Sequence, residues 1–457
     1  MKKERFLSLF LILTLFASLT PFAYAKDSFE ADARAALLID VESGETLYEK
    51  AAHERNFPAS ITKVMTALLV FEAVDAGQLR LDQEITARES AFENLASDGS
   101  TAGIKAGETM TVENLLNCLL IVSANEAAHI LAEAVAGDID AFVARMNERA
   151  QQLGCTDTHF ANPSGLHNDR HYTSAWDIYL ITREAMTHEG FMTIVGRKAY
   201  TVPATNIAKE RELHSTNYLI STWRTGWPGY YYEDARGIKT GSTPEAGYCL
   251  VATAVRANRQ LISVVLGAER VTLDDGTIQT RSFSETIRLF DHGFDDFKRM
   301  DLIDTDEFIC EVPVELSSET SYVVVHPAEA LSRMVPADLT LDDLERTVSL
   351  YAESVDAPIA EGDELGVITI SYGDTEYGTV PLIALNDVSA SWLLTKEREV
   401  KEFLARPWVK FAAIGAAVLV VGVAVMSAVL SSRSRRYRSG RRGSSYNYTG
   451  YRGRRKR

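Results

Sequence analysis

The chain has 457 residues, of which 46% are hydrophobic and 24% charged, and its net charge at pH 7 is −16. This length predicts at least two domains, and the composition is that of a globular protein, which excludes a wholly disordered chain. The acidic balance argues against nucleic acid as a partner.

Residues 1–25 have the parts of a secretory signal peptide. They start with three basic residues, continue with an apolar stretch at 6–16 and end on an Ala-x-Ala sequence. An uncleaved anchor helix is the alternative, but the apolar run is short and is interrupted at Pro21. We therefore expect this segment to be removed and the mature chain to be exported.

The region up to about residue 298 mixes strand and helix patterns, with strands at both ends and helices between them. The simplest arrangement joins these strands into one sheet that carries the helices, an α+β fold. The expected elements are two strands about a turn at 42–44, a helix from Ser60 to Ala76, helices within 111–154 with breaks near Ser123 and Gly137, a helix at 176–189, strands at 236–240, 247–256 and 260–268, and a closing helix at 278–294.

Residues 299–390 favour strands and predict a small all-β domain. Helical patterns fade after Met300, and short β-rich runs are separated by turn residues. A linker at 391–410 follows, with charged helix formers at 396–401. The expected strands are 308–314, 321–325, 347–350, 366–372 and 376–382.

Residues 411–430 predict a transmembrane helix, because none of these twenty residues is charged. Twenty helical residues span about 30 Å, the thickness of a hydrocarbon core. The tail at 431–457 contains eleven Arg or Lys and no acid, so it is expected in the cytoplasm, beside anionic lipid headgroups. We expect a single-pass protein of the cell membrane with its acidic body outside.

The tetrapeptide from Ser60 to Lys63 is the first candidate for chemistry. Positions three apart on a helix share a face, so the amine should lie beside the hydroxyl. A serine hydroxyl becomes a nucleophile when a neighbouring base takes its proton. Lysine can be that base if burial or another cation lowers its pKa. An ordinary helix-capping serine followed by a surface lysine is the simpler alternative.

Two further motifs support the chemical interpretation. Lys239-Thr240-Gly241 lies on a predicted strand, where the lysine and the hydroxyl could hold a substrate carboxylate and the glycine permits close approach. Ser123 and Asn125 form a Ser-x-Asn triplet at a predicted break between helices. The same triplet occurs at 215–217 and 445–447. We prefer the copy at 123–125 because it lies between the other two motifs in a helix-rich segment, whereas the copy at 445–447 is expected on the other side of the membrane.

In this order, the three motifs resemble the penicillin-recognising serine acyltransferases, and the match to D-alanyl-D-alanine carboxypeptidases covers roughly residues 35–388. Similar passages include FPASITKVMTALLVFE, IVSANEAAHILAE and GIKTGSTPEAGYCLVATA. The resemblance implies a β-lactamase/transpeptidase-like domain, in which an antiparallel sheet has helices on both faces and a helical subdomain. A small β domain and a membrane anchor follow it.

The resemblance also implies roles and partners. Ser60 would attack the carbonyl between two D-alanines of a peptidoglycan stem, Lys63 would be its base, and Ser123 would pass the proton to the leaving D-alanine. Asn125 would bind the substrate's backbone amide. Lys239 and Thr240 would hold the terminal carboxylate next to Gly241, and N–H groups of Ser60 and Ser242 would form the oxyanion hole. β-Lactam antibiotics would acylate Ser60.

This sequence departs from the family pattern at two positions. Glu126 stands where relatives usually have Asp, and Ser242 stands where many have a bulkier residue. Neither change removes a reactive group. Both can tune the geometry of a loop or the rate of deacylation.

Several alternatives stay open. A β-lactamase is the nearest, since residues 113–117 spell Glu-x-x-Leu-Asn, although Leu115 and Leu116 are more simply core. A D,D-endopeptidase or weak transpeptidase would use the same acyl-enzyme, and a non-catalytic wall-binding scaffold would use the fold alone.

No cofactor or metal is expected. His167 and His171 are four apart, but Pro163 and Gly165 predict a loop there and no third ligand is evident. Four cysteines match no metal spacing, so buried free thiols are expected, with a disulfide left open. The expected boundaries are a signal peptide at 1–25, a catalytic domain at 26–298, a β domain at 299–390, a linker at 391–410, a membrane span at 411–430 and a basic tail at 431–457.

Overall fold

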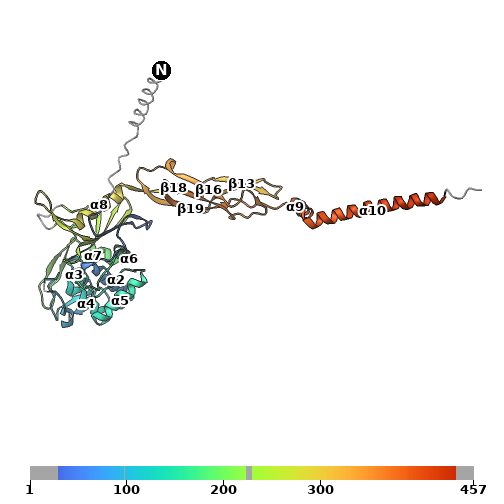
Figure 1. Ribbon diagram of the computed structural model, residues 1–457. Helices are drawn as coiled ribbons and strands as arrows, with labels where there is room; N and C mark the ends of the chain where they lie inside the picture. Colours follow the sequence, from blue (N-terminus) through green and yellow to red (C-terminus); the bar gives the residue numbers. More distant parts are fainter. Residues whose placement is uncertain (1–28, 97, 223–228, 439–457) are drawn as a thin grey trace, which may run out of the picture. The chain divides into compact units, whose positions relative to one another are not determined.

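The structure, a computed structural model, describes residues 29–96, 98–222 and 229–438 (Figure 1). The predicted signal peptide and most of the basic tail lie outside these residues. The chain forms two compact units, one reaching Met300 and including 333–340, the other comprising 301–332 and the chain from Leu341 onward.

The first unit is built on a five-stranded antiparallel sheet with the strand order β2-β1-β9-β8-β7. The first and last parts of this unit therefore meet in one sheet, as the sequence predicts. The hairpin between β8 and β9 turns at Ala257 and Asn258, which both have positive φ. The strands are β1 (Ala35–Asp40), β2 (Thr46–Lys50), β7 (Ala235–Thr243), β8 (Gly247–Arg256) and β9 (Arg259–Ala268).

The two faces of this sheet bury different side chains, because neighbouring residues of a strand point to opposite sides. Leu37 and Ile39 of β1 belong to the core beneath the helical part. Leu38 belongs to a second core, which contains Leu289 and Phe290 of α8 (Arg281–Asp295). Helices thus cover both faces, as Figure 1 shows for α8 and the α2–α7 group, and the expected α+β fold is confirmed.

The helical part contains α2 (Lys63–Asp75), α3 (Val112–Ile121), α4 (Asn125–Ala136), α5 (Ile139–Gln152), α6 (Ala175–Ala185) and α7 (Glu189–Val195). The predicted breaks near Ser123 and Gly137 are confirmed. The helix expected at 176–189 instead ends at Ala185. Small two-stranded sheets pair β3 (Glu84–Thr86) with β4 (Thr109–Thr111), β5 (Ala199–Val202) with β6 (Arg211–His214), and β10 (Arg270–Thr272) with β11 (Ile278–Thr280).

Two helix starts differ from the prediction. Ser60 lies in a 3-10 turn, Ala59–Thr62, that precedes α2. Ala59 has a φ of +47°, and the Thr62 hydroxyl donates to the Ala59 carbonyl. The chain therefore makes a 3-10 turn, which is tighter than an α-helical turn, before α2 begins. Similarly, the first residues of the expected closing helix form strand β11, because they pair with β10.

The second unit contains a six-stranded sheet of order β16-β18-β19-β14-β13-β17, which buries alternate apolar residues such as Ile368, Ile370 and Leu382. Its strands are β13 (Cys310–Glu315), β14 (Tyr322–Pro327), β16 (Glu345–Leu350), β17 (Val355–Asp356), β18 (Glu364–Tyr372) and β19 (Thr375–Ala384). Strands β12 (Phe297–Ile303) and β15 (Leu331–Pro336) complete the strands of the described chain. The small all-β domain is confirmed.

Two helices end the described chain, α9 (Trp392–Ala405) and α10 (Pro407–Arg438). Within α10, the segment Pro407–Ser432 has a mean hydropathy of 2.6 and is long and apolar enough to cross a membrane. This helix therefore fits a membrane anchor, as the sequence predicts.

Candidate active site

The amine of Lys63 lies at the centre of a group of buried oxygens. Lys63 is fully buried, and its Nζ lies 2.9 Å from Ser60 Oγ, 2.8 Å from Asn125 Oδ1 and 2.6 Å from the carbonyl oxygen of Ser164. Residues from three separate parts of the chain thus contact one amine. The expected proximity of the amine and the Ser60 hydroxyl is present, although Ser60 is in the 3-10 turn.

The surroundings of Lys63 disfavour its charged form. Burial lowers the pKa of Lys63 well below its ordinary value of 10.5, and the positive charge of Lys239 lowers it further. The carboxylate of Glu126 acts in the opposite direction. An amine in this setting can be unprotonated at a pH where a surface lysine is fully charged.

The loop at 161–166 supplies the third oxygen, and the sequence analysis missed this role. Asn162 Oδ1 accepts hydrogen bonds from the backbone N–H groups of Ser164 (3.2 Å), Gly165 (2.7 Å) and Leu166 (3.2 Å). Asn162 Nδ2 donates to the Leu166 carbonyl at 2.8 Å. One side chain therefore fixes the loop that aims the Ser164 carbonyl at Lys63.

Gly165 brings this loop against the 3-10 turn. A Cβ at position 165 would lie 1.9 Å from the Ala59 carbonyl oxygen, and the φ of Gly165 is +83°. Only glycine fits both the contact and the backbone conformation. The Ser60 turn and the loop are thereby held in direct contact.

His171, considered above as a metal ligand, has a structural position instead. Its Nδ1 accepts the backbone N–H of Ala161, so its Nε2–H donates to the Thr62 hydroxyl at 2.8 Å. Burial lowers the pKa of His171 to about 3, which keeps the ring neutral. His171 thus links the loop to the Ser60 turn. Among the described residues no group of three or more His, Cys, Asp or Glu could hold a metal ion.

The Ser-x-Asn triplet lies between α3 and α4, facing the same centre. Ser123 has a φ of +64°, an uncommon conformation for a residue other than glycine, and its buried hydroxyl has no hydrogen-bond partner among the described residues. Asn125 starts α4, where its side chain reaches Lys63 and its backbone N–H donates to the Ser100 carbonyl at 2.9 Å. The triplet therefore offers an amide that contacts Lys63 and a hydroxyl that borders the cavity at Ser60.

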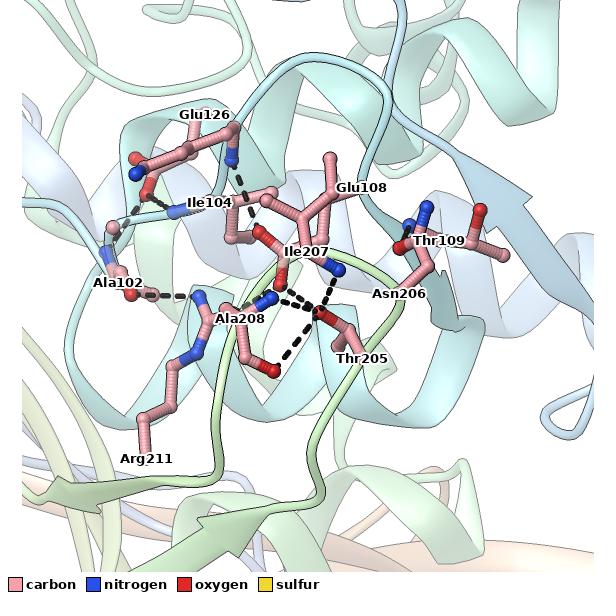
Figure 2. Close-up of polar contacts among 12 residues, drawn as sticks. Ala102, Ile104, Glu108, Thr109, Glu126, Thr205, Asn206, Ile207, Ala208 and Arg211 are labelled. Atoms are coloured by element: carbon pink, nitrogen blue, oxygen red, sulfur yellow. Dashed lines mark hydrogen bonds and ion pairs between the residues drawn. The ribbon is translucent and has the colours of Figure 1, made fainter.

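Glu126 fixes the segment that follows Ser100, as Figure 2 shows. Its buried carboxylate accepts hydrogen bonds from the Thr101 hydroxyl at 2.7 Å and from the backbone N–H of Ala102 at 2.8 Å. The carbonyl of Ala102 in turn accepts from Arg211 of β6 at 2.9 Å, and Arg211 is paired with the buried Glu108. The Glu126 carboxylate thus holds this segment.

Strand β7 carries the Lys-Thr-Gly motif along the Ser60 turn. A Cβ at Gly241 would lie 2.9 Å from both the Ser60 nitrogen and the Pro58 carbonyl oxygen, so this position requires glycine. The Thr240 hydroxyl is hydrogen-bonded to that of Thr216 at 2.8 Å. Thr216 is the middle residue of the Ser-x-Asn copy that the sequence analysis set aside, so that copy also lies at this site.

Lys239 is buried within this unit. Its Nζ donates to the Thr240 carbonyl at 2.8 Å, and burial lowers its pKa to about 7. Lys239 is absent from the described residues that line the two cavities at Ser60. Lys239 therefore acts on Lys63 and on the cleft through its positive charge, from a position below the cavity surface.

Two cavities meet at Ser60. One, of about 200 Å³, is also bordered by Ser123, Thr216 and Thr240. The other, of about 690 Å³, is bordered by Asn125 and by the 165–167 part of the loop. Ser242 lines both. A substrate can thus lie across Ser60 with one end in each cavity.

The Glu-x-x-Leu-Asn sequence that favoured a β-lactamase is a structural part of α3. Leu115 and Leu116 are buried in the core. Arg197 pairs with Glu113 and donates to Asn117 at 2.6 Å. These residues are not among those lining the Ser60 cavities. The four cysteines are free thiols, and three of them, Cys118, Cys155 and Cys249, are buried.

Comparisons with known proteins agree with this geometry. The family model described as D-alanyl-D-alanine carboxypeptidase matches residues 22–270, and that of the penicillin-binding protein 5 C-terminal domain matches 297–390. The chain is 30% identical over 417 residues to D-alanyl-D-alanine carboxypeptidase DacF of Bacillus subtilis, covering 89% of this chain and 100% of that protein. It is 31% identical over 382 residues to DacC of Escherichia coli, covering 82% and 89%.

Solved structures show the same relationship. The D-alanyl-D-alanine carboxypeptidase DacD of Francisella tularensis superposes with a TM-score of 0.64 at 26% identity, over 79% of this chain and 95% of that one. Penicillin-binding protein 5 of Haemophilus influenzae gives 0.59 at 27% identity, over 79% and 98%. With its fold, its Ser-Lys centre and these relatives taken together, the chain belongs to the D-alanyl-D-alanine carboxypeptidases, serine peptidases of the low-molecular-mass penicillin-binding protein family.

Proposed function

We propose that Ser60 is the nucleophile of this carboxypeptidase and that Lys63 is its general base. The enzyme removes the terminal D-alanine from pentapeptide stems of peptidoglycan through an acyl-enzyme on Ser60. The observation that carries this assignment is the buried Lys63 amine, 2.9 Å from the Ser60 hydroxyl.

The hydrogen bonds of Lys63 favour transfer of the proton from Ser60. An unprotonated amine has two N–H bonds and one lone pair. The Asn125 and Ser164 oxygens accept the two N–H groups, so the lone pair faces the Ser60 hydroxyl, which donates to it. As Oγ attacks the carbonyl carbon, its proton moves to Nζ, and the ammonium that forms keeps both oxygen contacts.

The backbone N–H groups of Ser60 and Ser242 would stabilise the oxyanion of the tetrahedral intermediate. The close approach of β7 to the Ser60 turn at Gly241 supports this pairing, because it brings the two backbones together. The Ser123 hydroxyl, which has no hydrogen-bond partner in the described part of the chain, would pass the proton from Lys63 to the nitrogen of the departing D-alanine. The bond from carbon to that nitrogen then breaks.

The smaller cavity would hold the leaving D-alanine and the larger one the rest of the stem. Thr240 borders the smaller cavity and would donate to the terminal carboxylate, while the charge of Lys239 attracts it from beneath. The Asn125 side chain borders the larger cavity and would bind the substrate's backbone amide. Water then attacks the Ser60 ester and releases the shortened stem. A β-lactam would open on Ser60 in the same way and leave a covalent adduct.

We also propose the domain boundaries and topology expected from the sequence. The catalytic domain is 26–298, the β domain 299–390 and the linker 391–410, with a signal peptide before and the span at 411–430 after. The span and the basic tail would contact membrane lipids. The eleven basic residues that follow the span support a cytoplasmic tail and a catalytic part outside the cell.

The test uses the full chain in detergent with a muropeptide that ends in D-Ala-D-Ala. Chromatography should show the pentapeptide becoming a tetrapeptide with release of free D-alanine, and Ser60→Ala should abolish this reaction. Release of D-alanine at an unchanged rate by that variant would refute the assignment. Penicillin turnover faster than peptide turnover would favour a β-lactamase instead.

A further inference from the structure

The segment 100–104 begins in the wall of both cavities at Ser60. Ser100 lines the two cavities, and its carbonyl accepts the backbone N–H of Asn125 at 2.9 Å. The side-chain oxygen of Asn125 in turn contacts the Lys63 amine at 2.8 Å. The position of this short segment therefore affects both the shape of the cleft and one of the contacts of Lys63.

Glu126 and Arg211 hold this segment at the two backbone polar groups of one residue. The N–H of Ala102 donates to Glu126 at 2.8 Å, and the carbonyl of Ala102 accepts from Arg211 Nη1 at 2.9 Å (Figure 2). Through Nη2, Arg211 also pairs with Glu108, whose side chain is fully buried. The two contacts use different nitrogens of one planar guanidinium, and lysine would keep the charge but not this forked geometry.

The loop between β5 and β6 is attached to the chain just beyond this segment. The Thr205 hydroxyl donates to Glu108 at 2.9 Å, and the Asn206 side chain accepts the backbone N–H of Thr109 at 2.8 Å, as Figure 2 shows. These hydrogen bonds do not involve Arg211. A substitution of Arg211 therefore leaves the contacts that attach the hairpin, and removes the contact that reaches the segment 100–104.

The chain that leaves β6 reaches another side of the smaller cavity. Thr216, five residues after Arg211, lines this cavity, and its hydroxyl is hydrogen-bonded to that of Thr240 at 2.8 Å. The backbone N–H of Thr216 donates to the Ile121 carbonyl at 3.1 Å. Five extended residues span at most about 17 Å. One short stretch of chain thus connects the Ser100 side of the cavity with the Thr240 side.

We propose that Arg211 is a positioning residue that sets the spacing between the Ser100 and Thr240 sides of the smaller cavity. It acts without touching the substrate, since it is not among the described residues that line either cavity. This inference rests on the proposed function, in which Thr240 receives the terminal carboxylate. When the contact to Ala102 is lost, the two sides can move apart. The carboxylate is then no longer held in line with the carbonyl that Ser60 attacks.

The experiment compares two thioesters with the full chain in detergent, N-benzoyl-D-alanylthioglycolate and its carboxamide, N-benzoyl-D-alanylthioglycolamide. They differ only in the terminal carboxylate, and the ratio of their kcat/KM values does not depend on how much of the enzyme is folded. We expect the wild type to prefer the carboxylate by at least about tenfold, the effect of one charge-assisted hydrogen bond. In Arg211→Lys this preference should fall toward one, because lysine keeps a charge beside Glu108 and loses the contact to Ala102.

A second variant combines Arg211→Met with Glu108→Gln, which leaves neither buried charge without its partner, and it should lose the preference as well. Arg197→Lys is the matched control, since Arg197 precedes the same hairpin and pairs with Glu113 of α3 instead. It should keep the wild-type preference.

A wild-type preference in both Arg211 variants would overturn the positioning role and leave the proposed function intact. An equal loss of preference in Arg197→Lys would also overturn it, because any disturbance of the hairpin would then have the same effect. Equal kcat/KM for both thioesters in the wild type would instead contradict the carboxylate site of the proposed function and, with it, this inference.

Discussion

Replacing Asn162 by Ala tests whether the loop at 161–166 prepares Lys63 for catalysis. The substitution removes the oxygen that accepts three backbone N–H groups and the amide that donates to Leu166. The catalytic side chains themselves stay in place. The Ser164 carbonyl, 2.6 Å from the Lys63 amine, then loses the contacts that aim it.

The size of the effect follows from the hydrogen bonds lost. The two shortest, at 2.7 Å to the Gly165 N–H and 2.8 Å to the Leu166 carbonyl, are each worth about 0.5–1.5 kcal/mol. Their loss amounts to about 1–3 kcal/mol, which is about 5- to 150-fold in a rate constant if the loop must be ordered for acylation. Asn162→Asp keeps the acceptor and loses only the donor, so we expect a smaller loss.

The assay is the second-order rate of acylation by a fluorescent penicillin, measured together with the melting temperature of each variant. Asn168→Ala is the control, because Asn168 lies further along the same segment and, among the described residues, its side chain is hydrogen-bonded only to the nearby Arg170 N–H. We expect slow acylation in Asn162→Ala while the protein is still folded at the assay temperature, and a wild-type rate in Asn168→Ala. A wild-type rate in Asn162→Ala would refute the role given to the loop.

The remaining predictions concern charge and close packing. Deprotonation of Lys63 should make kcat/KM rise with pH. Above about pH 7, kcat/KM should fall again, because Lys239, whose pKa is lowered to about 7, loses the charge that attracts the substrate carboxylate. A pH profile of kcat/KM that stays flat through pH 7 would contradict the role of Lys239. Since Glu126 raises the pKa of Lys63, Glu126→Gln should move the rising limb to lower pH, and a shift to higher pH in the same titration would contradict this. Gly241→Ala should lower the acylation rate at least about 100-fold, because the added Cβ would lie 2.9 Å from the Ser60 nitrogen. The same contact should lower the free energy of unfolding in urea by about 1–3 kcal/mol. A normal acylation rate in this variant would show that β7 can move away from the Ser60 turn.

The parts of the site that the sequence predicts are those encoded by local spacing. Ser60 and Lys63 are three apart, so a helical turn of either kind brings hydroxyl and amine together, and the 3-10 start does not alter that outcome. Continuous β-rich runs separated by turn residues likewise predict the strands that build the central sheet. Local sequence patterns were therefore sufficient for the fold class and for the Ser-Lys pair.

The contacts that the sequence analysis missed are made by irregular backbone far along the chain. Ser164 binds Lys63 through its carbonyl, a group that every residue has, so no residue type marks it. Thr216 was set aside because its triplet lies outside the helix-rich segment that contains Ser123, yet its hydroxyl is hydrogen-bonded to that of Thr240. Asn162 and Gly165 do carry a signal, since Asn and Gly are typical of tightly turned loops.

The neutral amine at position 63 is the central claim, and Lys63→Arg tests it most directly. Arginine fills a similar volume and keeps hydrogen-bond donors for Asn125 and Ser164, but its guanidinium stays protonated and cannot accept the Ser60 proton. Mass spectrometry after incubation with a labelled penicillin should find the adduct on Ser60 in the wild type and none in the folded Lys63→Arg variant. An adduct on Ser60 of that variant, formed at the wild-type rate, would contradict the account.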